Sequence, residues 1–320
     1  MNIIETCNLR QSYWTKASLA DILPPDATLS WRTEVLHDLN LTVPTGSIFA
    51  LLGANGAGKT TTLKVLLNLL RPTAGVARVL GVDSNRLGER ELAQIGYVSE
   101  NQQLPLWMTV RQLLDYCRPF YPTWDRALEA KLLARFALPP ERKLKQLSRG
   151  MLMKAALLSA LAHRPQLLIL DEPFSGLDPV VRDDVSRGLL ESVRLGETSV
   201  LVSSHDIEEV ERLADHVALL DAGRLRLTET TESLLGRFRR IEVDSEAAWP
   251  AGGLPAGWLG WQSAAGRTSF IESAYRRETT EEHCRKFFPL AAVRAHPLTL
   301  REIFITLARA GQSQNQGAGA

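Results

Sequence analysis

Short apolar runs separated by helical patterns fill the chain from Leu36 to about Gly236. Three of these runs, Ser47–Leu52, Leu167–Leu170 and Ser199–Ser203, have the length of strands and end at glycine, acidic or hydroxyl residues. Apolar strands that alternate with helices are typical of a mostly parallel sheet with both faces covered. The pattern therefore predicts an α/β fold.

The chain changes character on either side of this central region. Residues up to about 33 carry a short strand-like start followed by a loop that contains two prolines. A basic stretch at 237–240 is followed by a segment rich in Trp, Gly and Pro, which two strand-like pieces flank, Ile241–Val243 and Ser269–Ile271. We therefore expect a domain boundary near residue 236.

The residues beyond this boundary form the part of the sequence that is hardest to interpret. We expect a small C-terminal α+β domain over 237–310, because its strand-like pieces are few and short. Residues 311–320 are small and polar, and we expect them to form a disordered tail.

Composition narrows the classes of protein to consider. The 320 residues are enough for one large domain and a smaller one. Lys and Arg number 37 and Asp and Glu 36, a balance that argues against binding nucleic acid through bulk charge. Three scattered cysteines indicate a reducing compartment. No secretory signal or long apolar run is apparent, so we expect a cytoplasmic chain that reaches a membrane only through a partner.

A glycine-rich segment, Gly53–Thr60, joins the first apolar run to a helical pattern. It matches G-x-x-x-x-G-K-[ST] in the strand–loop–helix context that this motif requires. Glycines let backbone N–H groups surround phosphate oxygens, and the helix N-terminus adds positive charge. A glycine-rich turn that matches by chance is the alternative. The residues expected to contact the nucleotide are Gly53, Asn55, Gly56, Gly58, Lys59, Thr60 and Thr61.

Within this segment we expect Lys59 to reach the β- and γ-phosphates and to assist catalysis. The hydroxyl of Thr60 is expected to bind Mg²⁺. The apolar run at 167–170 ends in two acids, Asp171 and Glu172. Adjacent strand residues face opposite ways, so we expect Asp171 to serve Mg²⁺ and Glu172 to activate the attacking water. An acidic strand end that simply meets solvent is the alternative.

One histidine, His205, follows a buried-looking strand of the same core. We expect it to contact a γ-phosphate and to take part in catalysis. A lone histidine after a strand is usually structural, so this assignment depends on the neighbouring motifs. The other five histidines show no metal-ligand spacing and are expected to be structural or exposed.

Taken in order, the phosphate loop, Leu147–Met151, the Asp171-Glu172 pair, Ser175–Asp178 and His205 resemble the nucleotide-binding subunit of ABC transporters. The resemblance covers roughly 36–227. It implies a P-loop (RecA-like) core with an antiparallel β subdomain and an α-helical subdomain over about 101–163, all within 1–236. It also implies ATP and Mg²⁺ as cofactors and ATP hydrolysis coupled to transport.

The resemblance further implies a head-to-tail dimer with a second copy or a homologous subunit. ATP then lies between the phosphate loop of one copy and the helix that starts after Ser148 in the other. Ser148, Gly150 and Asp178 of that other copy contact it. The helix that starts after Ser148 offers N–H groups that suit phosphate. Ser148 also fits an ordinary helix N-cap, and both roles are compatible.

Two departures from the family pattern bear on the direction of transport. Arg149, Gly150 and Met151 replace the usual two glycines and glutamine, and Glu100 stands where many members carry a glutamine that serves the metal. Both resemble subunits of type-2 ABC exporters, as do 206–212 and 298–304. We therefore expect export rather than import, and we include Glu100 in the expected metal site.

The residue that stacks on adenine is open between two aromatics. Tyr13 lies in a segment that resembles the start of the family, whereas counting back from Leu36 favours Trp31. An insertion over about 14–33 separates the two. A tyrosine or tryptophan ring suits this contact because its face stacks on a base; we favour Tyr13.

The remaining expectations concern partners. An integral membrane permease is expected to meet the helical subdomain, where Trp107 stands in an aromatic-rich stretch; packing inside the subdomain is the alternative for each of these aromatics. A soluble ABC-type ATPase that acts on ribosomes or nucleic acid is the second function considered. The single set of motifs and the absence of an inserted coiled coil argue against it, and no nucleic-acid partner is expected.

Overall fold

The computed structural model describes residues 1–18, 28–194, 198–245, 255, 257–289 and 291–317. The prolines of the expected N-terminal loop and the first part of the Trp-rich segment lie outside these ranges. The chain divides into two compact units, Met1–Thr228 and Glu229–Ala320. Each unit has its own core and is described separately.

A six-stranded sheet forms the centre of the first unit, in the order β11-β10-β4-β9-β8-β7. The four pairs from β10 to β7 are parallel. β4, β8 and β9 are buried along their whole length, which confirms the α/β fold expected from the apolar runs. The strands span Ile48–Leu52 (β4), Ile95–Val98 (β7), Leu167–Asp171 (β8), Ser199–Ser204 (β9), His216–Asp221 (β10) and Arg224–Thr230 (β11).

A second sheet in this unit is antiparallel, in the order β2-β1-β5-β6, with β3 paired to β1. Its long hairpin differs from expectation: β1 and β2 pair from Leu9 and Leu39 out to Ser18 and Thr28. Part of the expected insertion is therefore strand. Its apolar and polar residues alternate only weakly, so the sequence pattern did not indicate a strand there. The strands span Asn2–Ser18 (β1), Thr28–Leu39 (β2), Thr42–Pro44 (β3), Ala74–Val79 (β5) and Val82–Asp83 (β6).

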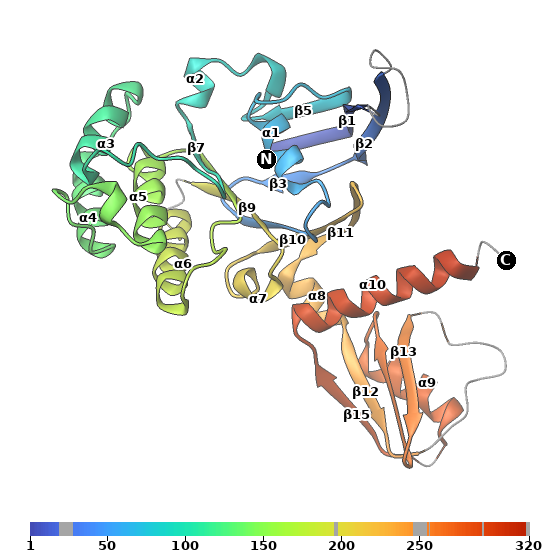
Figure 1. Cartoon of the computed structure of the whole chain (residues 1–320). Coiled ribbons are helices and arrows are strands. Elements are labelled where there is room, and N and C mark those ends of the chain that lie inside the picture. The colour runs from blue at the N-terminus through green and yellow to red at the C-terminus, as the bar shows by residue number, and fades with distance from the viewer. Residues whose placement is uncertain (19–27, 195–197, 246–254, 256, 290, 318–320) are drawn as a thin grey trace. The chain divides into compact units, whose positions relative to one another are not determined.

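A group of three helices, α3, α4 and α5, lies together within the range expected for the helical subdomain (Figure 1). Each begins at a residue whose side chain accepts a bond from the first turn: Thr109, Asp125 and Ser148. The helices of the first unit span Lys59–Leu66 (α1), Glu89–Leu92 (α2), Val110–Cys117 (α3), Arg126–Arg135 (α4), Arg149–Leu161 (α5), Pro179–Arg194 (α6) and Ile207–Val210 (α7). Short 3-10 turns span Ser84–Arg86, Arg118–Phe120 and Leu144–Gln146.

The second unit is a four-stranded antiparallel sheet, ordered β13-β14-β12-β15, with an aromatic core. The expected boundary at 236 falls inside α8, and the structure divides the chain before that helix. Where we expected a disordered tail, α10 continues to Gly317, and 318–320 lie outside the described residues. The elements span Thr231–Arg237 (α8), Arg239–Val243 (β12), Trp258–Ala264 (β13), Arg267–Glu272 (β14), Arg277–Phe287 (α9), Val293–Pro297 (β15) and Leu300–Gly317 (α10).

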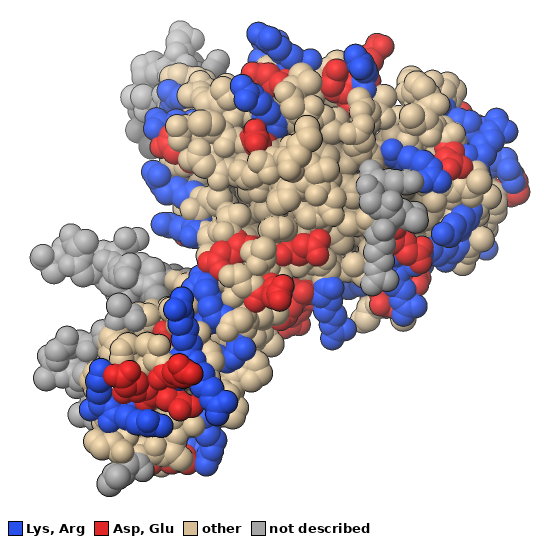
Figure 2. Space-filling view, turned by 180° about the vertical axis from the view of Figure 1, so that it is seen from behind, with Lys and Arg blue, Asp and Glu red and all other residues tan. Residues whose placement is uncertain are grey.

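The surface mixes charges of both signs. On the face in Figure 2, basic and acidic side chains lie interspersed over the described residues of each unit, as the near-equal totals of the sequence suggest. None of the helices in the described ranges has both the length and the apolar character that a bilayer crossing requires.

Candidate active site

The loop between β4 and α1 has a backbone that only glycine adopts readily at two positions. Gly56 has φ +82° and Gly58 φ +107°, both in the left-handed region. Gly53 has a different reason to lack a side chain, because a Cβ there would lie 2.3 Å from the carbonyl oxygen of Leu220 on β10. The loop is therefore pressed against the sheet and bent by its glycines, which leaves its backbone close to whatever it binds.

Lys59 extends back through this loop from the first residue of α1. Its side chain is only 6% exposed, and its Nζ donates to the carbonyl oxygens of Gly53 at 2.7 Å and Ala54 at 3.3 Å. The same Nζ lies 3.0 Å from Oε1 of Glu172. The ammonium group is thus held between the loop and an acid from a neighbouring strand end.

Asp171, the last residue of β8, joins the phosphate loop to β9. Its Oδ2 accepts a hydrogen bond from Thr60 Oγ1 at 2.8 Å, and its Oδ1 accepts one from Ser203 Oγ at 2.6 Å. Hydroxyl and carboxylate oxygens are the donors that Mg²⁺ prefers, so Thr60 and Asp171 fit this ion. The sequence analysis missed Ser203 as a site residue; its one signal was a hydroxyl at the end of an apolar strand.

Glu172 leaves the strand in an unusual conformation. Its φ is +51°, which is uncommon for a residue other than glycine. Strand alternation therefore stops at Asp171, and our reason for separating the two acids was wrong although their partners do differ. The carboxylate is 5% exposed and its Oε2 lies 2.7 Å from His205 Nδ1. Glu172 thus faces Lys59 through one oxygen and His205 through the other.

Tyr13 lies beside the first turn of α1. Its hydroxyl is 3.4 Å from Thr61 Oγ1, and 37% of the residue is exposed. Trp31 pairs with Thr15 in the β1–β2 hairpin, but its side chain lies outside the described residues. The structure places Tyr13 next to the phosphate loop, and stacking on adenine stays a prediction.

Ser148, Gly150 and Asp178 make their contacts where α5 and α6 begin. Ser148 Oγ accepts from the backbone N–H of Met151 at 3.2 Å, and a Cβ on Gly150 would lie 3.0 Å from the methyl carbons of Val181. Asp178 Oδ1 accepts hydrogen bonds from the backbone N–H groups of Val180 and Val181. These residues form a second group, separate from the contacts among Lys59, Thr60, Asp171, Glu172 and His205.

Glu100 lies two residues beyond the end of β7, and its side chain is exposed. Val98 of β7 pairs with Leu170 of β8, so Glu100 leaves the sheet at the same edge as Asp171. Burial and the nearby Asp171 charge raise the pKa of Tyr97, on the same strand. The position is compatible with the expected metal role, which stays a prediction.

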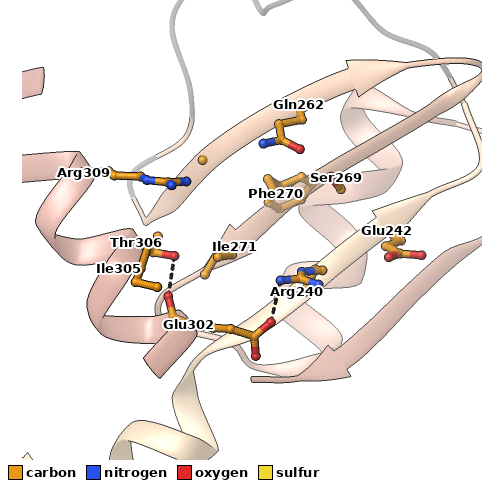
Figure 3. A pocket seen from close by; sticks show the side chains of 11 residues that line it. Arg240, Glu242, Gln262, Ser269, Phe270, Ile271, Glu302, Ile305, Thr306 and Arg309 are labelled. Atoms are coloured by element: carbon orange, nitrogen blue, oxygen red, sulfur yellow. Dashed lines mark hydrogen bonds and ion pairs between the residues drawn. The ribbon is translucent and has the colours of Figure 1, made fainter. Parts of the chain in front are cut away.

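The second unit contains a hollow of about 480 Å³ between its sheet and α10 (Figure 3). Its charged lining is already satisfied: Arg240 pairs with Glu302 at 2.8 Å, and Glu242 lies near Arg267 and His296. Buried or half-buried charges that satisfy one another offer little to a ligand. We therefore place the active site in the first unit.

Comparison with known proteins identifies the class to which this geometry belongs. The family profile described as ABC transporter matches residues 36–175, and one described as an AAA domain, putative AbiEii toxin, matches 140–211. A solved structure of an ATP-binding subunit of an ABC transporter is 26% identical, with a TM-score of 0.61, and the match covers 72% of this chain and 91% of that one.

Curated relatives agree with this class. An ABC transporter ATP-binding protein of Synechocystis is 32% identical over 250 residues, 76% of this chain and 67% of its own. The Nod factor export ATP-binding protein I of Rhizobium leguminosarum is 39% identical (59% and 62% covered). The sulfate/thiosulfate import ATP-binding protein of Escherichia coli K12 is 36% identical (63% and 58% covered).

The fold and the glycine-bent phosphate loop thus define a nucleotide-binding cassette. The chain belongs to the ABC transporter ATP-binding family and is an ATPase coupled to transport. The resemblance seen in the sequence motifs is confirmed.

Proposed function

We propose that the chain hydrolyses MgATP with Glu172 as general base and, as half of a head-to-tail dimer, drives a membrane permease that exports its substrate. The observation that carries the catalytic part is the arrangement around Glu172. Its carboxylate is buried and lies between Lys59 and His205, the residue that directly follows β9. A buried carboxylate at this point can take a proton from water that attacks a phosphate held by the loop.

Each neighbouring group has a role that its position supports. Lys59 neutralises phosphate charge, and the loop N–H groups with the α1 N-terminus bind phosphate oxygens. Thr60 and Asp171 would hold Mg²⁺, which supplies further charge neutralisation when bound. His205, whose side chain is 44% exposed, is free to turn toward a γ-phosphate from its contact with Glu172.

The second group of site residues supports the dimer. Ser148 and Asp178 lie at the exposed starts of α5 and α6, and their contacts are with those helices rather than with the phosphate loop. Helix N-termini suit phosphate. We assign them to the nucleotide bound by the other copy, so that two copies complete two sites.

Exposed aromatics on the helical subdomain support a permease contact. Trp107, Tyr116 and Phe120 are 68%, 58% and 63% exposed, which is unusual for large apolar side chains in one region. Met108 is buried, and Tyr121 stacks on His163 with ring centroids 4.0 Å apart, so these two pack the subdomain itself. The assignment to export depends on Arg149, Met151 and Glu100, since relatives named for export and for import both match.

The decisive experiment replaces the base. Glu172→Gln keeps the size of the side chain but removes its basicity, so we expect ATP hydrolysis to fall by about 10²–10³-fold while ATP still binds and a closed dimer accumulates. The matched control is Glu141→Gln, an exposed acid paired with Arg111. Phosphate release and gel filtration in ATP measure both effects. Hydrolysis by Glu172→Gln at the rate of the control would falsify the assignment of the base.

A further inference from the structure

Arg149, the first residue of α5, lies over the loop that follows the catalytic acids. A Cβ built on Gly176 would lie 2.6 Å from Arg149 Nη1 and 2.8 Å from Cζ, so the guanidinium rests directly against the glycine. Gly176 also has φ +68°, which a larger residue would resist. The contact therefore depends on glycine at 176 and on a side chain long and flat enough to reach it.

The position of Arg149 carries a local cost. A positive charge in the first turn of a helix is disfavoured by the helix dipole, and the usual residue here is a glycine by resemblance. An arginine that simply faced solvent would gain nothing to offset that cost. The contact with Gly176 supplies a reason for the arginine.

A second arginine, Arg182 of α6, contacts the same segment at the next residue. Its Nε donates to the carbonyl oxygen of Leu177 at 2.9 Å, and its Nη1 lies 2.9 Å from Glu209 Oε1. Leu177 is 5% exposed, so a hydrogen bond to its carbonyl oxygen matters more than one made in water. Ser175–Asp178 is thus contacted by a guanidinium from α5 and by one from α6.

Glu209 links Arg182 to the residue that precedes His205. The side chain is 5% exposed, and its Oε2 accepts from Ser204 Oγ at 3.1 Å. Burial raises the pKa of Glu209, and the Arg182 charge opposes that rise. Ser204 directly precedes His205, which contacts Glu172. The chain of contacts therefore runs from Ser175–Asp178 through Arg182, Glu209 and Ser204 to His205, which contacts the proposed base.

The starts of α5 and α6 are also fixed to each other. Gly150 and Val181 are so close that a Cβ on the glycine would lie 3.0 Å from two methyl carbons, and Lys154 pairs with Asp184 at 2.6 Å. The side chain of Lys154 is 10% exposed and that of Asp184 is 37% exposed, so the ion pair is partly buried. The two arginines therefore project from one rigid support.

We propose that Arg149 and Arg182 are positioning residues for hydrolysis, which clamp Ser175–Asp178 and so hold Glu172 and His205 in the geometry that activates water. The inference rests on the proposed function, since it needs Glu172 as base. Neither arginine acts on the reacting atoms. Their removal should lower turnover and leave the phosphate loop of the same copy, and therefore the affinity of a single copy for ATP, unchanged.

The test compares Arg149→Ala and Arg182→Ala with Arg187→Ala. Arg187 is an exposed arginine on the same α6, paired within the helix to Asp183, and is a control for loss of a charge. We expect turnover to fall roughly 5–20-fold in the first two variants, with ATP affinity by calorimetry within about twofold of wild type. Arg149→Lys should behave as Arg149→Ala, because an ammonium cannot lie flat against Gly176.

Hydrogen exchange gives a readout that does not need catalysis. Amides of Ser175–Asp178 should exchange at least about fivefold faster in both alanine variants, and not in Arg187→Ala, if the clamp holds this segment. Unchanged exchange there overturns the clamp even if turnover falls. Exchange that increases while Glu172→Gln remains fully active leaves the clamp standing and removes the proposed base instead.

The double variant separates positioning from direct contact with nucleotide. Two residues that hold one segment should not act independently, so Arg149→Ala/Arg182→Ala should lose little more turnover than the worse single variant. Full additivity, with Arg149→Ala raising KM at unchanged kcat, would mean that Arg149 binds the nucleotide of the other copy. That result overturns the inference.

Discussion

Both units of the chain have an apolar core, but they differ in the other groups that they bury. In the first unit, Lys59, Asp171 and Glu172 are each at most 6% exposed and converge on a glycine loop. In the second, the interior is a stack of rings around Trp258 and Phe270. Buried charge costs free energy unless it is paired, whereas buried rings stabilise through the apolar surface that they remove from water. The comparison indicates which interior serves chemistry and which serves folding.

The second unit also buries an acid, but the groups that bind this acid are neutral. Glu272 of the second unit is 5% exposed, but Trp258 Nε1 donates to its Oε2 at 2.8 Å and the N–H of Ala274 donates to Oε1 at 3.0 Å. Both oxygens are satisfied by neutral donors within the unit. A buried acid alone is therefore no sign of an active site; two buried acids whose partners include a lysine and a threonine at the end of a glycine loop are a stronger one.

The largest effect on ATP binding is expected at Lys59. Lys59→Ala removes the ammonium from the phosphate loop and leaves Glu172 buried without that charge, so ATP affinity should fall by at least about 10²-fold. Calorimetry with ATP measures this directly. Lys64→Ala, an exposed lysine on α1, is the control. Equal ATP affinity in the two variants would contradict the assignment of Lys59 to phosphate binding. It would also remove the contrast between the two units.

The largest effect on folding stability is expected from the loss of an aromatic anchor in the second unit. Trp258 is 3% exposed and stacks on Phe270 at 3.9 Å between centroids, so Trp258→Ala should destabilise this unit by about 3–5 kcal/mol. ATP hydrolysis should stay within about twofold of wild type. Denaturant unfolding measures the stability of the unit, and phosphate release from the folded protein measures ATP hydrolysis. A large drop in hydrolysis with the first unit still folded would show that the aromatic interior also serves the chemistry.

A third prediction concerns His163, a buried titratable group outside the active site. Burial lowers its pKa to about 4, so the folded protein keeps it neutral while the unfolded chain takes up a proton below about 6.5. Stability should therefore fall as pH drops through that window, by about 2 kcal/mol between pH 7.5 and 5.

The reference for this measurement is His163→Phe, which keeps a ring against Tyr121 but cannot be protonated. Unfolding free energies of both proteins at the two pH values isolate the contribution of the histidine. A wild-type protein whose stability changes with pH no more than that of the variant would show that His163 is hydrated or paired in solution.

The smallest effect is expected at Tyr13. Loss of a stacking ring should weaken ATP binding by about 1 kcal/mol, roughly fivefold, in Tyr13→Ala. Tyr13→Phe keeps the ring and loses only the long contact with Thr61, so its affinity should match wild type. Equal affinity for ATP in all three proteins would exclude Tyr13 as the adenine contact and return attention to Trp31.

Much of the active site was predictable because its motifs are local. Gly53–Thr60 combines a strand, a glycine loop and a helix start within one short segment, and the structure places β4, the loop and α1 there. Asp171 and Glu172 follow a short apolar run whose length favours a strand, and the structure has β8 there. The N-terminal hairpin was not predictable, because its strands lack the alternation that reveals a half-buried strand.

The sequence by itself determined the fold class and the family and indicated the residues that we propose hold and hydrolyse the nucleotide, because each motif is complete within a few neighbouring positions. Only the tertiary structure decided that Ser203 fixes Asp171, that Tyr13 reaches Thr61 and that Arg149 rests on Gly176. These contacts join residues that lie tens of positions apart. Their geometry depends on how strands and helices pack, which no local pattern specifies.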